Sequence, residues 1–333
     1  MKIWLPCADA VGGLKTLTEF LDQGLREAGH QSQITWFPYR WRYSPFRLRR
    51  LPTPPGTDVI VANSCHAFAL SRNHARLIAC TPHTVFDAAY RPYCSVSQRV
   101  FHALVLKRFE ASSFRAADAI VAISEYSAAS ARNLFPGINP TVIHPGVDTG
   151  FFCPAPGETP RSPKQRARLL FVGDLTKRKG ADLLPAIMQR LGPGFELYYT
   201  AAARRNVSLP SRGNMYPLGP LSKTELRDQY RRADLLLFPT RFEGFSMGVA
   251  EAMCCGTPVV TSACSALPEL IQDTRTGRLC PVEDVEAFAA AIQALCTQRD
   301  VLTQMGIRAR QAMESRFTIE RMTKQYLDLM REL

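Results

Sequence analysis

Short apolar runs alternate with amphipathic segments along most of the chain. In the first half, residues 2–7 (KIWLPC) and 58–64 (DVIVANS) have the length and apolar content of buried strands. Residues 13–30 instead carry leucines at positions 14, 17, 21 and 25, which is the spacing of a helix that ends near Gly29. Further strands are predicted at residues 32–37, 75–81, 118–124 and 141–147, and further helices at residues 98–117 and 125–135.

The same alternation restarts after residues 148–167, which are rich in proline, glycine and charge and are therefore the best candidate for a linker. Strands are predicted beyond it at residues 168–175, 195–202, 234–240, 257–262 and 276–281. Helices are predicted at residues 180–191, 224–233, 246–255, 265–273, 284–297 and 318–333. Continuous apolar strands that alternate with helices indicate parallel sheets covered on both faces.

We therefore predict an α/β protein made of two doubly wound, Rossmann-like domains that face a central cleft. The expected boundaries are residues 1–150 for the first domain and residues 151–315 for the second. Residues 316–333 are expected to form a C-terminal helix that returns toward the first domain. In open sheets of this class, ligands bind beyond the carboxyl ends of the strands, which is where candidate chemistry has to be sought.

The stretch TRFEGFSMGVAEAMCCGTPVV, residues 240–260, places one acid before a helix and another inside it. The helix is expected to begin near Ser246, a residue type that favours N-caps, and to end near Cys255. A helix N-terminus attracts anions, whereas carboxylates such as Glu243 and Glu251 accept hydrogen bonds from vicinal hydroxyls. The pattern therefore suits a diphosphate that carries sugars. The alternative is that Glu243 caps a loop and Glu251 is a solvated helix residue.

Residues 243–262 resemble the E-x7-E signature of the retaining glycosyltransferases related to glycogen synthase, known as family four, whose fold is GT-B. Residues 172–184 (VGDLTKRKGADLL) resemble the phosphate-binding segment of that family, and residues 142–152 resemble its domain junction. Residues 9–30 resemble its N-terminal glycine-rich turn and helix, and residues 317–330 its closing helix. The resemblance implies an acceptor-binding N-terminal domain and a C-terminal domain that binds a nucleotide sugar.

By this resemblance, Glu251 contacts the ribose of the donor, Glu243 contacts the transferred sugar, and Lys179 stabilises the departing diphosphate. The resemblance also implies several further donor-binding positions: Gly13, Gly173, Arg178, Leu218, Gly244, Phe245 and Ser246. Leu218 lies in the segment expected to hold the base. One position departs from the family pattern, because Asp174 stands where an arginine is usual. We expect Asp174 to face away from the diphosphate and Arg178 to supply the missing charge.

In the N-terminal domain, Gly12 and Gly13 follow the first strand, in the turn that the family places near the sugar and the acceptor. His83 follows a strand and resembles the active-site histidine of the family, which makes it a candidate catalytic residue beside Glu243 and Lys179. Asp87 is a weaker candidate for acceptor contact. The resemblance implies no cofactor and no metal ion, and the ten cysteines are scattered without metal-ligand spacing.

The formal charge of +12 and the pI near 9.4 favour anionic partners. Residues 37–52 mix arginines with aromatics, and the candidates for acceptor or membrane contact are Arg40, Trp41, Arg42, Arg47, Arg49 and Arg50. Such a mixture suits an anionic lipid surface or a phosphorylated glycan, and residues 102–115 are a possible extension of it. An ordinary basic loop is the alternative. Nucleic acid is a poorer match, because no nucleic-acid motif accompanies the segment.

The sequence thus predicts a metal-independent retaining glycosyltransferase of the hexosyltransferase type. The donor is a nucleotide-diphosphate sugar, and the acceptor is a glycan or a lipid-linked molecule of cell-envelope polysaccharide or lipopolysaccharide synthesis. A sugar-nucleotide epimerase of the same fold and a non-enzymatic basic membrane-binding protein are the alternatives. The first residues lack a signal-peptide pattern, and no run approaches the ~20 apolar residues that span a bilayer. We therefore expect a cytoplasmic protein that can dock on the inner face of the cell membrane.

Overall fold

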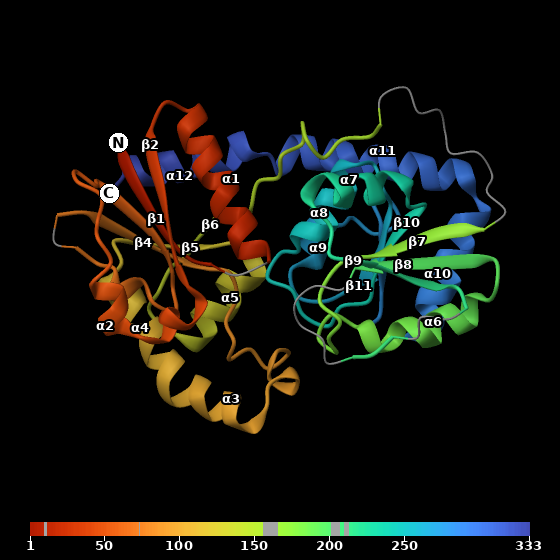
Figure 1. Ribbon diagram of the computed structural model, residues 1–333, viewed down its shortest axis with the longest axis horizontal. Helices are drawn as coiled ribbons and strands as arrows, with labels where there is room; N and C mark the ends of the chain where they lie inside the picture. Colours follow the sequence, from red (N-terminus) through yellow and green to blue (C-terminus); the bar gives the residue numbers. More distant parts are fainter. Residues whose placement is uncertain (10–11, 73, 156–165, 201–206, 210–212) are drawn as a thin grey trace. The chain divides into compact units, whose positions relative to one another are not determined.

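The protein folds into two compact units, each built on a six-stranded parallel sheet (Figure 1). The structure is a computed structural model that describes residues 1–9, 12–72, 74–155, 166–200, 207–209 and 213–333. The first unit comprises Met1–Gly146 and Phe317–Leu333, and the second comprises Val147–Arg316. Of the helices in the described part of the chain, none combines the length and the hydrophobicity needed to cross a bilayer.

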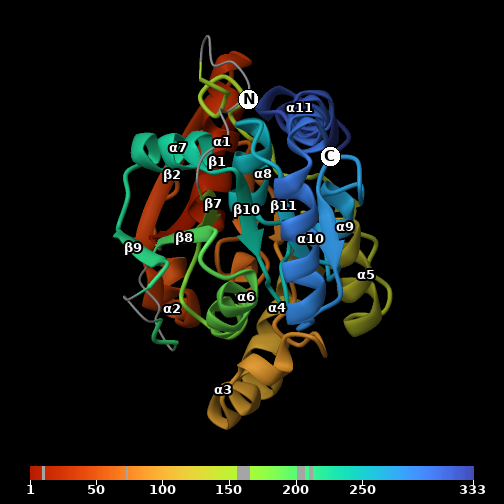
Figure 2. The ribbon, with the colours of Figure 1, turned by 90° about the vertical axis from the view of Figure 1, so that its right-hand side faces the viewer.

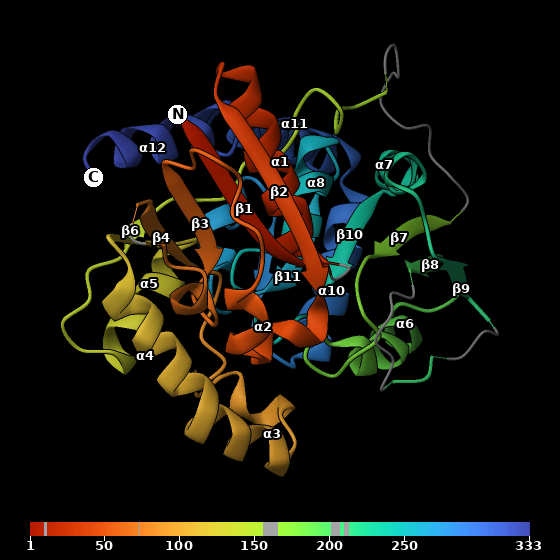
Figure 3. The same ribbon diagram turned by 60° about the vertical axis from the view of Figure 1, so that its left-hand side comes forward.

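The sheet of the first unit has the strand order β2-β1-β3-β4-β5-β6. Its strands are β1 (Lys2–Asp9), β2 (Gln31–Pro38), β3 (Val59–Asn63), β4 (Arg76–Thr81), β5 (Ala119–Ala122) and β6 (Thr141–Val142). Its helices are α1 (Gly13–Glu27), α2 (Pro45–Arg49), α3 (Val96–Phe101), α4 (Lys107–Ala116), α5 (Glu125–Leu134) and α12 (Ile319–Arg331). A π-helical turn, His102–Leu106, joins α3 and α4 into one long helix, seen at the lower edge of Figure 3.

Apolar side chains cover both faces of this sheet. On one face, Trp4 and Phe37 from the strands pack with Leu48 of α2 and Phe114 of α4. On another part of the unit, α12 packs against α1, and the hydroxyl of Tyr326 contacts the sulfur of Cys80 at 3.7 Å. The strand order reverses between β1 and β3, so the crevice beyond these two strands is where a doubly wound sheet is expected to bind a ligand.

The sheet of the second unit has the order β12-β11-β10-β7-β8-β9, which is the order typical of Rossmann folds. Its strands are β7 (Ala167–Phe171), β8 (Phe195–Thr200), β9 (Met215–Gly219), β10 (Leu235–Phe238), β11 (Val259–Ser262) and β12 (Arg278–Cys280). Its helices are α6 (Leu184–Leu191), α7 (Lys223–Arg232), α8 (Met247–Cys254), α9 (Leu267–Leu270), α10 (Val285–Thr297) and α11 (Arg299–Arg316). Helix α6 packs against α10, and α7 packs against α8 (Figure 2). The order reverses between β7 and β10.

The two sheets confirm the predicted fold class, while some elements differ from the prediction. Helix α11 was not predicted, although its buried Leu302, Met305, Ala309 and Met313 have helical spacing. The pattern is interrupted by Gly306, which the packing against α8 requires, because a Cβ there would lie 2.2 Å from the carbonyl oxygen of Gly256. Strand β9 and helix α2 were also missed, because residues 215–219 were considered only as part of the segment that holds the base and residues 45–49 only as part of the arginine and aromatic segment.

The predicted linker, residues 148–167, falls partly outside the described residues, at 156–165. The part before it is packed on the second unit rather than free. Phe152 is fully buried, and its carbonyl oxygen accepts a hydrogen bond of 3.0 Å from Arg310. The carbonyl oxygen of Cys153 accepts one of 2.7 Å from Arg231. These contacts correct the prediction for residues 148–155.

Candidate active site

The strand order of the second unit reverses between β7 and β10, and we call this place its switch point. Two loops beside it carry several of the residues that the sequence singled out. One loop follows β7 and contains Gly173, Arg178 and Lys179, and the other follows β10 and contains Glu243. Strands β7 and β10 are neighbours, with Leu169 paired to Leu235, so their carboxyl ends and the loops beyond them are adjacent. The sheet therefore places the two loops where a doubly wound fold binds its ligand.

The carboxylate of Glu243 is surrounded by donors. Its Oε1 atom lies 2.7 Å from Nζ of Lys179, 3.2 Å from Nη1 of Arg178 and 3.0 Å from the hydroxyl of Thr240. Its backbone N–H donates to the hydroxyl of Ser265 at 2.8 Å. Burial alone would raise the pKa of Glu243, but the positive charges of Lys179 and Arg178 outweigh it and hold that pKa below its ordinary value. Glu243 is therefore an ionised, immobilised carboxylate.

Lys179 is almost enclosed, with 17% of its side chain exposed. Burial lowers the pKa of Lys179, against the opposing negative charges of Glu243 and of Asp174. The negative charge of Asp174 thus acts on Lys179, and the orientation of Asp174 away from the diphosphate stays a prediction. Arg178 also donates to the carbonyl oxygen of Phe242 at 2.8 Å. Two cations share one carboxylate, so these three side chains together keep one net positive charge at the switch point.

Arg241, which the sequence analysis did not single out, fastens the two loops together. Its guanidinium forms a bidentate pair with Asp182 at 2.7 and 2.9 Å, and it also bonds to Glu283 and to the carbonyl oxygen of Lys177. Its own backbone N–H donates to the carbonyl oxygen of Arg178 at 2.8 Å. Only 6% of the Arg241 side chain is exposed. This side chain therefore fixes the segment that carries Lys179 against the segment that carries Glu243.

Gly180 brings the same two loops into contact. It has a φ of 72°, and a Cβ at this position would lie 1.8 Å from the carbonyl oxygen of Pro239. No residue with a side chain fits there without movement of the backbone. Gly173 precedes it in the loop, and its N–H donates to the hydroxyl of Thr200 at 3.0 Å. The glycine after Lys179 is therefore a packing requirement of this site.

Ser246 occupies the N-cap of α8 but does not cap it with its side chain. Its φ of 95° puts the residue in the left-handed region instead of the extended conformation that N-cap residues usually adopt. The helix begins where the sequence predicted, but without the side-chain cap. Gly244 is half-buried, and Phe245 and Ser246 are buried, so this part of the loop is largely shielded from solvent. Leu218, the candidate for base contact, lies on the edge strand β9 and is half-buried.

Glu251 lies in the middle of α8 and is buried, which excludes the alternative that it is a solvated helix residue. Its Oε2 atom accepts a hydrogen bond of 3.0 Å from the hydroxyl of Tyr230 on α7. Burial raises the pKa of Glu251 to about 7, although the Tyr230 bond and the charge of Lys223 oppose that rise. Among the described contacts, Glu251 and Glu243 have separate partners. Tyr230 is a second residue that sequence reasoning missed.

The first unit holds the remaining candidates at the ends of its strands. Gly13 begins α1 and is exposed, and Gly12 before it has a φ of 134°. His83 follows β4, is half-buried, and its ring lies 5.7 Å from that of Tyr90. Asp87 accepts hydrogen bonds from Tyr126 at 3.0 Å and from Ser130 at 2.7 Å. The carboxylate of Asp87 thus joins the loop after β4 to helix α5.

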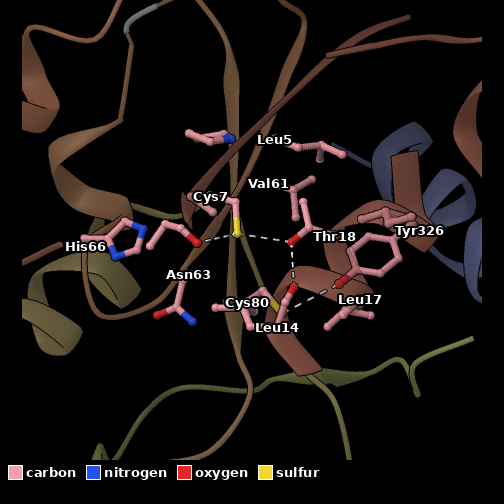
Figure 4. A pocket seen from close by; sticks show the side chains of 14 residues that line it. Leu5, Cys7, Leu14, Leu17, Thr18, Val61, Asn63, His66, Cys80 and Tyr326 are labelled. Atoms are coloured by element: carbon pink, nitrogen blue, oxygen red, sulfur yellow. Dashed lines mark hydrogen bonds between the residues drawn. The ribbon is translucent and has the colours of Figure 1, made fainter. Parts of the chain in front are cut away.

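A cavity of about 40 Å³ lies at the switch point of the first unit (Figure 4). Its polar lining includes Cys7, Thr18, Asn63, His66 and Cys80. His66 is 2% exposed, and burial lowers its pKa to about 3, so the ring is neutral. Its Nδ1 atom lies 3.0 Å from the sulfur of Cys65, and its Nε2 atom has no hydrogen-bond partner among the described residues. The sequence signal for His66 was the same as that for His83, a histidine just after a strand.

The arginine and aromatic segment forms a 3-10 helix, Tyr39–Tyr43, followed by α2. The guanidinium of Arg42 lies 3.9 Å from the ring centroid of Tyr39 and 4.4 Å from that of Tyr43. Arg47 lies 5.7 Å from the ring of Trp41. The arginines with exposed side chains are Arg40, Arg47, Arg49 and Arg50. Arg42 is therefore structural, and the other four arginines face solvent.

Two family models match consecutive parts of the chain. Residues 30–151 match the model described as Glycosyltransferase Family 4, and residues 166–298 match the model described as Glycosyl transferases group 1. The second match contains Lys179, Arg178, Glu243 and Glu251, and the two matches together cover most of the chain. The chain is a glycosyltransferase of the family-four type.

A named glycosyltransferase is also similar to part of this chain. D-inositol 3-phosphate glycosyltransferase from Mycobacteroides abscessus is 32% identical over 174 residues, which are 47% of this chain and 39% of that protein. The chain thus matches well under half of the length of this relative.

Two solved structures show the same fold over nearly the whole chain. Sucrose-phosphate synthase from Thermosynechococcus elongatus has a TM-score of 0.82 at 18% identity, covering 99% of this chain and 98% of that one. HepE from Anabaena, in complex with UDP and glucose, has a TM-score of 0.77 at 16% identity and covers 100% of both chains. This glycosyltransferase therefore has the GT-B fold.

Proposed function

We propose that this protein is a retaining glycosyltransferase that moves a sugar from a nucleotide-diphosphate sugar to a glycan or lipid-linked acceptor. The observation that carries the proposal is the contact of Lys179 and Arg178 with Glu243 at the switch point of the second unit. The match to the family-four model and the solved complex of HepE with UDP and glucose support a donor of this class.

In this proposal, Lys179 and Arg178 bind the diphosphate. The bond between the sugar and the phosphate breaks with a growth of negative charge on the departing oxygen, and a fixed cation beside it lowers the barrier. Lys179 and Arg178 share the single carboxylate of Glu243, so that carboxylate cannot neutralise both cations. Removing one such fixed donor costs about 2.7–4 kcal/mol in the barrier, or about 10²–10³ in rate.

Glu243 and Glu251 orient the two sugars of the donor. Glu243 is held ionised, so it can accept hydrogen bonds from hydroxyls of the transferred sugar. Glu251 uses Oε2 for Tyr230, and we assign its Oε1 to a ribose hydroxyl. In the retaining reaction, the acceptor hydroxyl attacks from the same side as the departing phosphate, and a phosphate oxygen takes up the proton. The residues of the chain hold the reacting groups in place and need no covalent intermediate.

The proposed reaction uses Lys179 and Arg178 as its source of positive charge, and we therefore expect it to proceed without a divalent ion. The acceptor is proposed to be a glycan or lipid-linked molecule of cell-envelope polysaccharide or lipopolysaccharide synthesis. Two features support an anionic acceptor or surface: the basic segment from Arg40 to Arg50 and the name of the D-inositol 3-phosphate glycosyltransferase relative. Peripheral docking on a membrane would bring a lipid-linked acceptor to the enzyme.

The test is the binding of nucleoside diphosphates to the full chain, measured by calorimetry and by thermal shift with UDP, GDP and ADP. A ligand present at 100 times its Kd stabilises the protein by about 2.7 kcal/mol. We expect one of the three to do so, and we expect Lys179→Met to weaken that binding. Lys177→Met is the matched control, because Lys177 is an exposed lysine in the same loop. The proposal fails if no diphosphate binds or if both variants bind equally well.

The stereochemistry and the metal dependence are tested separately by NMR. The matching nucleotide sugar is incubated with the enzyme, and the sugar released by slow hydrolysis is observed before it mutarotates. We expect the anomeric configuration of the donor and an unchanged rate in the presence of EDTA. An inverted product would contradict retention, and a loss of activity that magnesium restores would contradict metal independence.

A further inference from the structure

The first half of the long helix Val96–Ala116 presents aliphatic side chains to solvent. Val96 is 68% exposed, Val100 is 52% exposed and Leu104 is 57% exposed. They follow one another at intervals of four residues, so they lie along one side of the helix. The residues that anchor the helix to its unit come later, with Glu110 and Phe114 buried. Three exposed aliphatic residues in a row are unusual for a surface that faces only water.

The helix that carries this apolar side contacts the arginine segment of the same unit. The ring of Phe101 on α3 packs edge-on against the ring of Tyr43 at 5.3 Å, which joins the helix to the segment Tyr39–Arg49. Phe46 in that segment is 77% exposed, the highest exposure among the large apolar residues of the described chain. In Figures 1 and 3, α3 extends away from the sheet of its own unit. Half of the large apolar residues that the described chain exposes thus belong to these two neighbouring segments.

The charges of the two segments have one sign. Residues 28–57 contain five arginines and no acid. Residues 88–117 contain five further cations, Arg91, Arg99, Lys107, Arg108 and Arg115, and one acid. That acid is Glu110, which is only 3% exposed and therefore contributes little charge to the surface. These segments therefore expose both basic and aliphatic side chains.

We propose that the first half of the long helix Val96–Ala116, together with the segment Tyr39–Arg49, docks this protein on an anionic phospholipid bilayer. Val96, Val100 and Leu104 enter the boundary between headgroups and acyl chains, and the flanking cations contact lipid phosphates. An anionic bilayer is the occupant that satisfies both features, because aliphatic side chains gain free energy only by leaving water. A nucleic acid would use the cations, but it would leave the valines and the leucine exposed. The inference deepens the proposed function, since it supplies the surface on which a lipid-linked acceptor is reached.

The test is co-sedimentation of the full chain with vesicles of phosphatidylcholine, with and without 30% phosphatidylglycerol. We expect binding to the anionic vesicles only. A triple serine variant removes the aliphatic side: Val96→Ser, Val100→Ser and Leu104→Ser. The matched control replaces three similarly exposed aliphatic residues of the second unit: Val282→Ser, Val301→Ser and Ile307→Ser. We expect the first variant to lose about tenfold or more in partitioning and the control to lose nothing.

A second variant tests the charges, with Arg47→Gln, Arg99→Gln and Lys107→Gln. Each lost cation is expected to weaken binding about fivefold and to reduce its dependence on salt. The proposal is overturned if the serine variant binds as well as the wild type, or if neutral and anionic vesicles bind equally. It is also overturned if a 20-nucleotide RNA displaces the protein from vesicles and binds the serine variant normally, because the surface would then serve nucleic acid.

Nucleoside diphosphate binding is measured on each of these variants as well. None of the substituted residues belongs to the second unit's switch point, so diphosphate binding should equal that of the wild type. Loss of vesicle binding with normal diphosphate binding supports docking. Failure of the wild type to bind vesicles, with diphosphate binding intact, refutes docking alone, whereas failure to bind any diphosphate refutes the donor site alone.

Discussion

Replacing Arg241 with methionine tests whether the two loops of the switch point depend on a single side chain. Methionine keeps much of the length and apolar volume of arginine, but it loses the bidentate contact with Asp182 and the bonds to Glu283 and to the carbonyl oxygen of Lys177. The loop that carries Lys179 is then held to the loop after β10 by the contacts of Lys179 and Arg178 with Glu243 and by the backbone bond from residue 241 to Arg178. The variant therefore leaves Lys179 and Glu243 in the chain and tests whether their positions depend on Arg241.

The cost of this change follows from burial. Breaking a buried ion pair by removing one partner costs about 3–5 kcal/mol. Asp182 keeps 29% of its side chain exposed, so water can cover part of the abandoned charge. We therefore expect a loss of about 2–3 kcal/mol in the free energy of unfolding. For a unit of this size that corresponds to a fall of about 5–10 °C in Tm.

The effect on function is expected to exceed that of lost stability. A misplacement of catalytic groups by about 1 Å can cost about 10²-fold in rate, so kcat should fall and diphosphate binding should weaken at temperatures where the variant is folded. Arg299→Met is the matched control, because Arg299 pairs at 2.9 Å with the fully buried Asp234 at the opposite end of β10. Thermal unfolding and calorimetry with the diphosphate are measured on both.

We expect both variants to lose stability and only Arg241→Met to lose diphosphate affinity. The reasoning is refuted if Arg241→Met binds the diphosphate like the wild type. It is equally refuted if Arg299→Met loses as much affinity, because the effect would then reflect general destabilisation of the unit.

Three further predictions concern single residues. Burial raises the pKa of Glu251 to about 7, so its side chain becomes a carboxylate as pH rises through that value. The diphosphate affinity of the wild type, divided by that of Glu251→Gln, should therefore grow between pH 6 and pH 8. A ratio that stays constant in calorimetry would contradict this. Burial raises the pKa of Glu110 to about 8, above its unfolded value, so its contribution to stability is present below pH 4.5 and is lost as pH rises through 8. The free energy of unfolding of the wild type relative to Glu110→Gln, measured with urea, should therefore fall from pH 5 to pH 9, and a constant difference would exclude this assignment. Gly180→Ala should lower Tm more than Gly192→Ala. Both glycines have φ above 70°, but only at residue 180 would the new Cβ lie against a carbonyl oxygen, that of Pro239. Equal losses would show that the strain of the positive φ, rather than the clash, dominates.

Most of the fold could be predicted because strands buried on both faces leave a continuous apolar signal. The runs around Val59–Asn63 and Leu235–Phe238 are short, apolar and bounded by polar residues, and both are central strands. Helix α11 was missed because its apolar stripe is weak and contains a glycine, and the reason for that glycine is a neighbour distant in sequence. The close approach of Gly306 to Gly256 is a property of packing that no local pattern contains.

The candidate site also contains residues that the sequence indicated and residues that only the structure shows. Resemblance of motifs indicated that Lys179 and Glu243 belong to one site, and the structure brings them to 2.7 Å. Arg241 could not be found in this way, because its partners lie at residues 182 and 283, far from it in sequence and without periodicity. Tyr230 was missed for the same reason, since its hydroxyl reaches Glu251 from another helix. The roles of His83, Asp87 and Gly13 in catalysis or binding remain predictions.

In the proposed function, the cations of the switch point hold the diphosphate of an activated sugar. The most direct measurement is a crystal structure of the protein with the nucleoside diphosphate that binds best. We predict a phosphate oxygen within about 3 Å of Nζ of Lys179, beside Arg178, with the ribose hydroxyls on Glu251. A diphosphate bound elsewhere on the second unit, with the contact of Lys179 and Glu243 undisturbed and empty of ligand, would contradict the claim.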